Sequence, residues 1–186
     1  MALSSPKAGP PGSSAAAAND LFVVPPDALQ WRGKRFACAL GRSGVRLDKA
    51  EGDGATPCGS FALRRVLYRP DRLPPPRTAL PVAALNPHDG WCDDPADPLY
   101  NQQIRQPYTA SFEMLWRSDE LYDVIVVLGH NDSPTLPGKG SAIFMHVATR
   151  DYAPTAGCIA LARKDLLTIL EDCEPRARLV IPAPGR

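Results

Sequence analysis

One histidine and one cysteine lie close together in this sequence, in an arrangement that suits covalent acyl transfer. An apolar run ends at His146, a polar turn containing Pro154 follows, and Gly157 and Cys158 stand at the end of that turn. A thiol is a weak nucleophile at neutral pH, but an imidazole within hydrogen-bond reach activates it. Because glycine lets the main chain approach a substrate closely, the amides of Gly157 and Cys158 could face a developing oxyanion. These residues predict a cysteine nucleophile activated by a histidine.

A purely structural role for Cys158 is the alternative. Free cysteines are among the most buried residue types, and a single cysteine commonly serves packing. The chain has five cysteines, with no Cys-x-x-Cys pair and no zinc-finger spacing, and their disulfide pairing cannot be deduced from the sequence. An odd number leaves at least one thiol unpaired, and we expect that thiol to be Cys158. The other four are Cys38, Cys58, Cys92 and Cys173.

The residues around Cys158 resemble a known catalytic signature. His146 followed by the stretch 155–159, Thr-Ala-Gly-Cys-Ile, is similar to the L,D-transpeptidase catalytic domain family (YkuD-like). The family signature is a histidine, a loop, and Ser/Thr-x-Gly-Cys followed by an aliphatic residue, and its members are cysteine acyltransferases of bacterial peptidoglycan. The resemblance is strongest over 120–181, weaker over 33–61 and 89–101, and absent before residue 20.

The resemblance implies a ping-pong reaction on peptidoglycan stem peptides. Cys158 would attack a stem carbonyl and expel D-alanine, while His146 takes the thiol proton or holds the thiolate as an ion pair. An amine of a second stem would then accept the acyl group and form a cross-link, whereas water would give carboxypeptidase activity. Carbapenem-type β-lactams are expected to acylate Cys158, and no cofactor or metal is implied. Thr155 would position the loop, and the expected substrate-binding residues are His130, Thr155, Arg150, Tyr100 and Asn101.

One departure from the family pattern removes a cation. Ala160 stands where many members carry Arg or Asn after the Cys-aliphatic pair. An arginine there would suit a substrate carboxylate, because its planar guanidinium binds carboxylates in a bidentate manner. Either Arg105 or Arg150 is the expected replacement, unless the acceptor geometry differs.

Other departures concern the loop itself. Ala156 replaces a histidine that many members have before Gly-Cys, Val147 stands where many have glycine, and the loop between His146 and Cys158 is short. His130 either compensates by orienting His146 or lining the pocket, or it caps a turn. These differences indicate a divergent branch, and some divergent members are thought to make cross-links that start at the first stem residue.

Two further loops carry polar residues. The stretch 49–61 resembles the K-x-E-G-D-x-x-T-P-x-G-x-F segment of the family. We expect its main role to be shaping the wall of the site and its secondary role to be lining the substrate groove. His88, Cys92, Asp93 and Asp94 are types that bind metals. However, adjacent aspartates on a proline-bounded loop are typical of turns. The stretch also resembles a family loop that covers the substrate groove, so no metal site is expected.

The elements that must position these residues are mainly short strands. Two segments, 122–128 and 141–147, are expected to lie side by side, which places both His130 and His146 near the site. A mostly β domain is predicted, with its site on loops, and the resemblance implies a β-sandwich of mixed sheets with a few short helices. Strands are predicted over 21–24, 35–40, 45–47 (pairing back as a hairpin), 61–68, 122–128, 141–147 and 177–181, and helices over 111–121 and 165–172.

Composition limits the remaining possibilities. The chain has 186 residues and a net charge of +1, which argues against electrostatic binding of nucleic acid. Residues 1–20, rich in Ala, Gly, Pro and Ser, are predicted to be a disordered arm, and 21–186 a single catalytic domain. The arm lacks the apolar segment that a secretory signal peptide has. The sequence contains no run of 18 apolar residues, so no membrane-spanning helix is predicted. We expect a monomer, and a periplasmic or cell-envelope location follows only from the implied function.

Two other classes of function stay open. A catalytically silent cell-wall binding module could keep the fold, and its Cys158 would react no faster than an ordinary thiol. A cysteine endopeptidase, carboxypeptidase or amidase would give hydrolysis products only and would be indifferent to added amines. The presence of both His146 and Cys158 argues against the first class.

Overall fold

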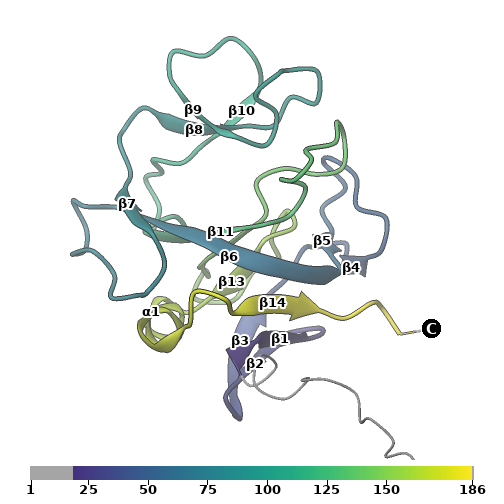
Figure 1. The fold of residues 1–186 in the computed structure, drawn as a ribbon, viewed down its shortest axis with the longest axis vertical. Coiled ribbons are helices and arrows are strands. Elements are labelled where there is room, and N and C mark those ends of the chain that lie inside the picture. The colour runs from purple at the N-terminus through teal and green to yellow at the C-terminus, as the bar shows by residue number, and fades with distance from the viewer. Residues whose placement is uncertain (1–18, 186) are drawn as a thin grey trace, which may run out of the picture.

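The chain folds mainly into β-strands (Figure 1). The computed structural model describes residues 19–185. The predicted disordered arm lies outside the described residues except for Asn19 and Asp20. These two residues contact the domain, since Trp31 Nε1 donates to the Asn19 carbonyl and the Arg178 amide donates to Asp20.

Within the described residues, fourteen strands and one α-helix follow one another. They are β1 (Leu21–Val24), β2 (Ala28–Trp31), β3 (Lys34–Ala39), β4 (Val45–Arg46), β5 (Thr56–Pro57), β6 (Gly59–Tyr68), β7 (Val82–Ala84), β8 (Asp89–Cys92), β9 (Gln103–Arg105), β10 (Phe112–Met114), β11 (Val124–Leu128), β12 (Phe144–Val147), β13 (Ile159–Leu161), α1 (Arg163–Asp172) and β14 (Arg178–Ile181). Across residues 19–185, α1 is the only α-helix, and it is too short to cross a bilayer. The expectation of a few short helices is therefore wrong for this part of the chain.

The main sheet closes on itself. Its nine strands run in the order β11-β12-β13-β3-β2-β1-β14-β6-β7, and β11 also pairs with β6. The long strand β6 makes this closure possible, because its first residues pair with β14 and its later residues pair with β11. The result is a barrel-like sheet, and the expected β-sandwich is not confirmed. A three-stranded sheet, β10-β8-β9, lies apart from it at the top of Figure 1, and β4 pairs with β5.

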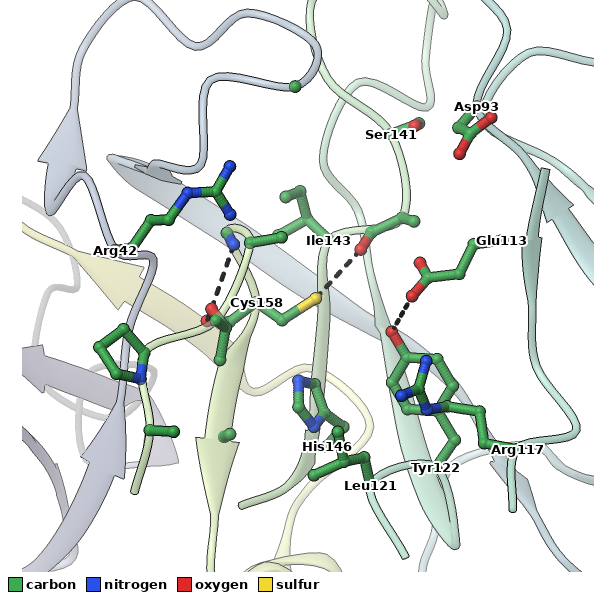
Figure 2. Close-up of a pocket in the computed structure, with 18 of the residues that line it drawn as sticks. Arg42, Asp93, Glu113, Arg117, Leu121, Tyr122, Ser141, Ile143, His146 and Cys158 are labelled. Carbon is green, nitrogen blue, oxygen red and sulfur yellow. Dashed lines mark hydrogen bonds between the residues drawn. The ribbon is translucent and has the colours of Figure 1, made fainter. Parts of the chain in front are cut away.

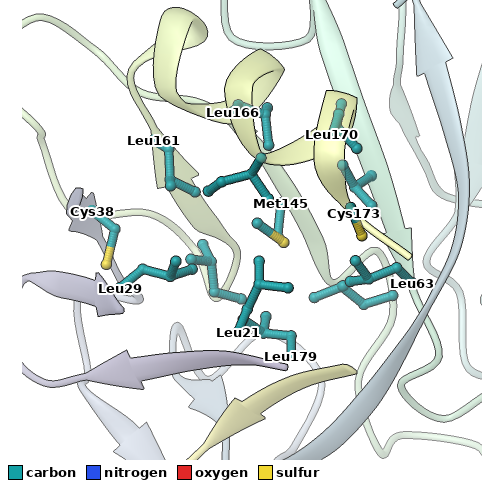
Figure 3. Close-up of a cluster of buried hydrophobic side chains, with 14 of the residues drawn as sticks. Leu21, Leu29, Cys38, Leu63, Met145, Leu161, Leu166, Leu170, Cys173 and Leu179 are labelled. Atoms are coloured by element: carbon teal, nitrogen blue, oxygen red, sulfur yellow. The ribbon is translucent and has the colours of Figure 1, made fainter. Parts of the chain in front are cut away.

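Alternation of side chains along the strands separates two apolar clusters. Met145 of β12 and Ile159 of β13 belong to the first cluster, which α1 and the main sheet enclose (Figure 3). Phe144 and Cys158 belong to the second cluster. Because successive residues of a strand point to opposite faces, His146 shares the face of Phe144. The histidine and the cysteine therefore lie on the same side of the sheet.

Two elements cover the two clusters. Helix α1 buries Leu166, Ile169 and Leu170 against the first cluster. It corresponds to the helix predicted over 165–172. Over the second cluster, Trp91 of β8 packs edge-on against Phe144, with ring centroids 5.0 Å apart. The smaller sheet thus forms the outer wall of the region that holds Cys158.

Two predicted elements are wrong. The segment 111–121 is not a helix, because Phe112–Met114 forms β10 and pairs antiparallel with β8. The strand at 45–47 does not pair back as a hairpin, since Val45–Arg46 pairs in parallel with Thr56–Pro57. In both cases, pairing with a distant segment overrides the local pattern. The predicted strands at 21–24, 35–40, 61–68, 122–128, 141–147 and 177–181 correspond to β1, β3, β6, β11, β12 and β14.

Candidate active site

His146 and Cys158 come from neighbouring parallel strands. In the register of β12 and β13, Met145 is opposite Ile159 and His146 is opposite Ala160. Cys158 precedes β13 directly, so its side chain shares a face with Ala160 two residues later. Both Cys158 and His146 line one cleft of about 550 Å³ (Figure 2).

The contacts and burial of Cys158 favour the protonated thiol. Its Sγ donates to the Ala142 carbonyl at 3.1 Å and accepts from the Phe144 amide at 3.4 Å. The residue is only 7% exposed. Burial, followed by the negative charge of Glu113, raises the pKa of the Cys158 thiol to about 12. The resting thiol therefore needs a proton acceptor before it can act as a nucleophile.

His146 has the properties of such an acceptor. Its Nδ1 lies 2.8 Å from the Val147 carbonyl oxygen. A carbonyl can only accept, so Nδ1 carries the proton and Nε2 keeps its lone pair. Burial lowers the pKa of His146 to about 4, which keeps the imidazole neutral. A neutral thiol beside a neutral imidazole fits general-base activation better than a preformed ion pair.

The turn before Cys158 is held by a threonine and needs a glycine. Thr155 Oγ1 donates to the Cys158 carbonyl at 2.7 Å and accepts from the Gly157 amide at 3.1 Å. Gly157 has a φ of +146°, and a Cβ there would lie 2.8 Å from the Ala55 carbonyl oxygen. The predicted positioning role of Thr155 matches these contacts. The Gly157 amide, by contrast, is already engaged at rest and would have to leave Thr155 to hold an oxyanion.

The stretch 49–55 forms one wall of the cleft. The buried Lys49 Nζ lies 2.5 Å from Asp53 Oδ1, and Asp53 also accepts from the amides of Ala50 and Ala55 at 2.9 and 2.8 Å. Lys49 and Glu51 line the cleft. The loop thus shapes the wall and faces the interior of the cleft, as its two expected roles require.

A tyrosine lies next to His146 and links it to the carboxyl group of Glu113. The Tyr122 ring packs edge-on against the His146 ring with centroids 5.3 Å apart, and its hydroxyl donates to Glu113 Oε1 at 2.6 Å. Burial raises the pKa of Glu113, and the nearby charge of Asp93 acts in the same direction. All of these side chains line the cleft, where Arg42, Arg117 and Ser141 join them.

Most of these polar residues do not stand out in the sequence. A helix over 111–121 would place Glu113 on its solvent side, whereas β10 directs it into the cleft. From the sequence, Asp93 is recognisable only as a turn residue or a metal ligand. Within residues 19–185, no group of three or more His, Cys, Asp or Glu is arranged to bind a metal. The five cysteines are all free thiols.

The arginines expected to replace the missing cation do not reach the cleft. Arg150 is exposed and does not line it. Arg105 lines a different pocket and lies 3.7 Å from Asp89. Neither arginine lines the cleft, and the arginines that do line it are Arg42 and Arg117. Arg42 is brought there by its amide, which donates to the Thr155 carbonyl at 2.9 Å.

Three other predicted substrate-binding residues support the cleft from outside. Asn101 accepts from Trp91 Nε1 at 2.9 Å and donates to the His130 carbonyl at 3.0 Å. The Tyr100 hydroxyl donates to Glu51 and accepts from the Gly140 amide. His130 Nε2 lies 3.0 Å from the Lys139 carbonyl oxygen, which fits the turn-holding alternative. None of the three lines the cleft itself.

Comparison with known proteins identifies one match. The family model of the L,D-transpeptidase catalytic domain (YkuD) matches residues 16–181, which is most of the chain. No curated protein matches, and no solved structure matches.

Proposed function

Because the chain belongs to the L,D-transpeptidase catalytic domain family (YkuD), we propose that it is a peptidoglycan L,D-transpeptidase. It would transfer an acyl group from one stem peptide to an amine of a second stem and release D-alanine. The observation that carries this proposal is the placement of Cys158 and His146 on one face of two neighbouring strands, in one cleft. A wall substrate implies action in the periplasm or cell envelope.

The first half-reaction uses His146 as a general base. As Cys158 Sγ attacks the donor carbonyl, its proton passes from the thiol to His146 Nε2. The C–N bond to D-alanine then breaks, and the imidazolium returns the proton to the leaving amine. A thioester on Cys158 remains. For this step the thiol leaves the Ala142 carbonyl, its partner at rest, and turns toward the imidazole.

Arg42 is proposed to hold the carboxylate of the D-alanine leaving group. Its guanidinium is exposed, lines the cleft and would touch a Cβ at Gly54. In Figure 2 it lies across the thiol from Glu113. A guanidinium binds a carboxylate in a bidentate manner, so Arg42 can supply the charge that Ala160 lacks.

Intact-mass analysis after mixing with a carbapenem tests the nucleophile. We expect one adduct on the wild type and on Cys58→Ala, which removes a half-exposed thiol that does not line the cleft. We expect none on Cys158→Ala. A stem tetrapeptide incubated with the wild type should release D-alanine. A folded wild type that neither forms the adduct nor releases D-alanine would support the silent-module alternative instead.

The products of the same incubation identify the reaction. Cross-linked dimer indicates transfer to an amine, whereas free tripeptide alone indicates a carboxypeptidase. A dimer that disappears in Cys158→Ala would support the transpeptidase, and tripeptide alone would contradict it.

A further inference from the structure

One side of the cleft carries carboxylate oxygens that lack a cationic partner. Asp93 Oδ1 is buried without any hydrogen-bond partner. Glu113 uses Oε1 to accept from the Tyr122 hydroxyl. Glu113 of β10 is opposite Trp91 of β8, and Asp93 follows two residues later, where its amide donates to the Ser111 carbonyl. The two carboxyl groups are therefore neighbours on one face of the small sheet. Buried polar atoms are normally paired, and this side of the cleft therefore has unused hydrogen-bond acceptors.

Ser141 adds a second, independent sign of a ligand site. It is 6% exposed, and its Oγ has no hydrogen-bond partner. The nearest polar group is the Tyr100 hydroxyl, and while burial raises the pKa of Tyr100, Ser141 lowers it slightly. That hydroxyl already donates to Glu51 and accepts from the Gly140 amide, and it makes no well-aligned hydrogen bond with Ser141 Oγ. Figure 2 shows Ser141, Asp93 and Glu113 along the same side of the cleft, with Cys158 Sγ directed to that side.

No lysine or arginine among the described residues forms an ion pair with Asp93 or Glu113, although the charge of Arg117 partly offsets the effect of burial on the pKa of Glu113. Lys49, which lines the cleft, is paired with Asp53 at 2.5 Å. Arg117, which also lines it, is held by both carboxylate oxygens of Asp119 at 2.9 and 2.6 Å. A positive group that satisfies Asp93 and Glu113 must therefore come from a ligand.

We propose that Asp93, Glu113 and Ser141 bind the primary ammonium group of the acyl acceptor, the amine of the second stem. An ammonium has three donors and no acceptor, which matches one oxygen from each of these three residues. The proposal rests on the proposed transpeptidase function. It explains how the site would favour an amine over water, since water carries no charge for the carboxylates to attract.

The chemistry of the second half-reaction balances with this placement. The ammonium gives one proton to the Glu113 carboxylate and becomes an amine. The amine attacks the thioester carbonyl, passes a second proton to His146 Nε2, and the C–S bond breaks to leave the Cys158 thiolate. His146 then reprotonates the thiolate, and Glu113 loses its proton to solvent. Glu113 lies close enough to Cys158 for its charge to raise the pKa of that thiol.

The partition between transfer and hydrolysis tests the proposal. Stem tetrapeptide is incubated with wild type, Asp93→Asn, Glu113→Gln and Ser141→Ala, and D-alanine, dimer and free tripeptide are measured together. Asp94→Asn is the matched control, because Asp94 accepts from the Ala96 amide and does not line the cleft. We expect the dimer-to-tripeptide ratio to fall roughly tenfold in the two carboxylate variants, as expected when one charge-assisted hydrogen bond is lost. The Asp94→Asn ratio should match the wild type.

The acceptor concentration gives a second readout. With Nα-acetyl-lysine added as the amine, half-maximal transfer should require roughly tenfold more amine in Asp93→Asn than in the wild type and in Asp94→Asn. Unchanged ratios in all three folded variants would overturn the ammonium site and leave the transpeptidase standing. A wild type that releases D-alanine but never forms dimer would overturn the ammonium site together with the transpeptidase reaction on which it rests. A wild type without D-alanine release or carbapenem adduct would overturn the proposed function itself.

Discussion

Replacing Gly157 with alanine tests whether the turn before the thiol is held by its contact with the stretch 49–55. Gly157 has a φ of +146°, which L side chains rarely adopt. An added Cβ would lie 2.8 Å from the Ala55 carbonyl oxygen and 3.2 Å from Ile143 Cδ1. The Ala55 carbonyl oxygen belongs to the main chain and cannot move by a side-chain rotation. The turn that carries Gly157 and the stretch 49–55 must therefore move apart.

The expected effects follow from the backbone strain and from the displaced amides. A strained backbone conformation costs about 1–3 kcal/mol. For a domain of this size, a loss of about 2 kcal/mol lowers the melting temperature by roughly 4–8 °C. If the amide of Cys158 moves away from the developing oxyanion, acylation by a carbapenem should slow by about 100-fold or more.

Gly33→Ala is the matched control. Gly33 also has a positive φ, +74°, but a Cβ there would meet nothing within 4 Å. This variant should lose about 1 kcal/mol and acylate at the wild-type rate. Thermal melting and the rate of adduct formation are measured on all three proteins. If Gly157→Ala melts like Gly33→Ala and acylates at the wild-type rate, the proposed contact and its role in acylation are refuted.

Two further predictions concern pH and a buried carboxylate. Burial lowers the pKa of His146 from 6.5 to about 4, so the acid limb of the acylation rate should lie near pH 4, and a limb near 6.5 would contradict this. The unfolded state then binds the proton more readily between these pH values, so stability in urea should fall as pH drops from about 6.5 to about 4, by about 3 kcal/mol in total. Asp123 is fully buried and pairs with Arg72 at 2.6 Å and Arg163 at 2.9 Å. Asp123→Ala should cost about 3 kcal/mol in urea unfolding, at the lower end for broken buried pairs because both arginines reach solvent. A loss under about 1 kcal/mol would show that the pairs contribute little.

The strands that carry the site are predictable because their residues strongly favour the extended conformation. Val124–Leu128 is a run of β-branched and aliphatic residues buried along its whole length, which favours a strand with a core on both faces. The apolar run that ends at His146 pairs with it, as expected from their adjacency in the sequence. The placement of His146 near Cys158 could therefore be expected from local pattern and spacing, whereas their catalytic roles rest on the family resemblance and stay a prediction.

The acidic side of the cleft could not be found in the same way. Phe112, Leu115 and Trp116 have a spacing that fits a helix, and on such a helix Glu113 would face solvent. Pairing of Phe112–Met114 with β8 decides otherwise. Arg42 escapes sequence reasoning for a similar reason, because its place depends on a bridge between Gly41 and Thr155 that local sequence does not indicate.

The burial of Cys158 changes how the silent-module alternative must be examined. Slow alkylation of this thiol by a small reagent would be expected of an active enzyme as well, because burial, followed by the charge of Glu113, raises the pKa of Cys158 to about 12. Acylation by a ligand that fills the cleft separates the two alternatives, whereas simple thiol reactivity does not.

The parallel pairing of β12 with β13 has a consequence for motion. Strand β12, which carries His146, and strand β13, which follows Cys158, lie inside a closed sheet, with β11 on one side and β3 on the other. Their amides should exchange with solvent deuterium only when the whole domain opens. The spacing of nucleophile and imidazole is thus tied to global stability, and adjustments to substrate fall to the loops that carry Ala142, Thr155 and Lys49.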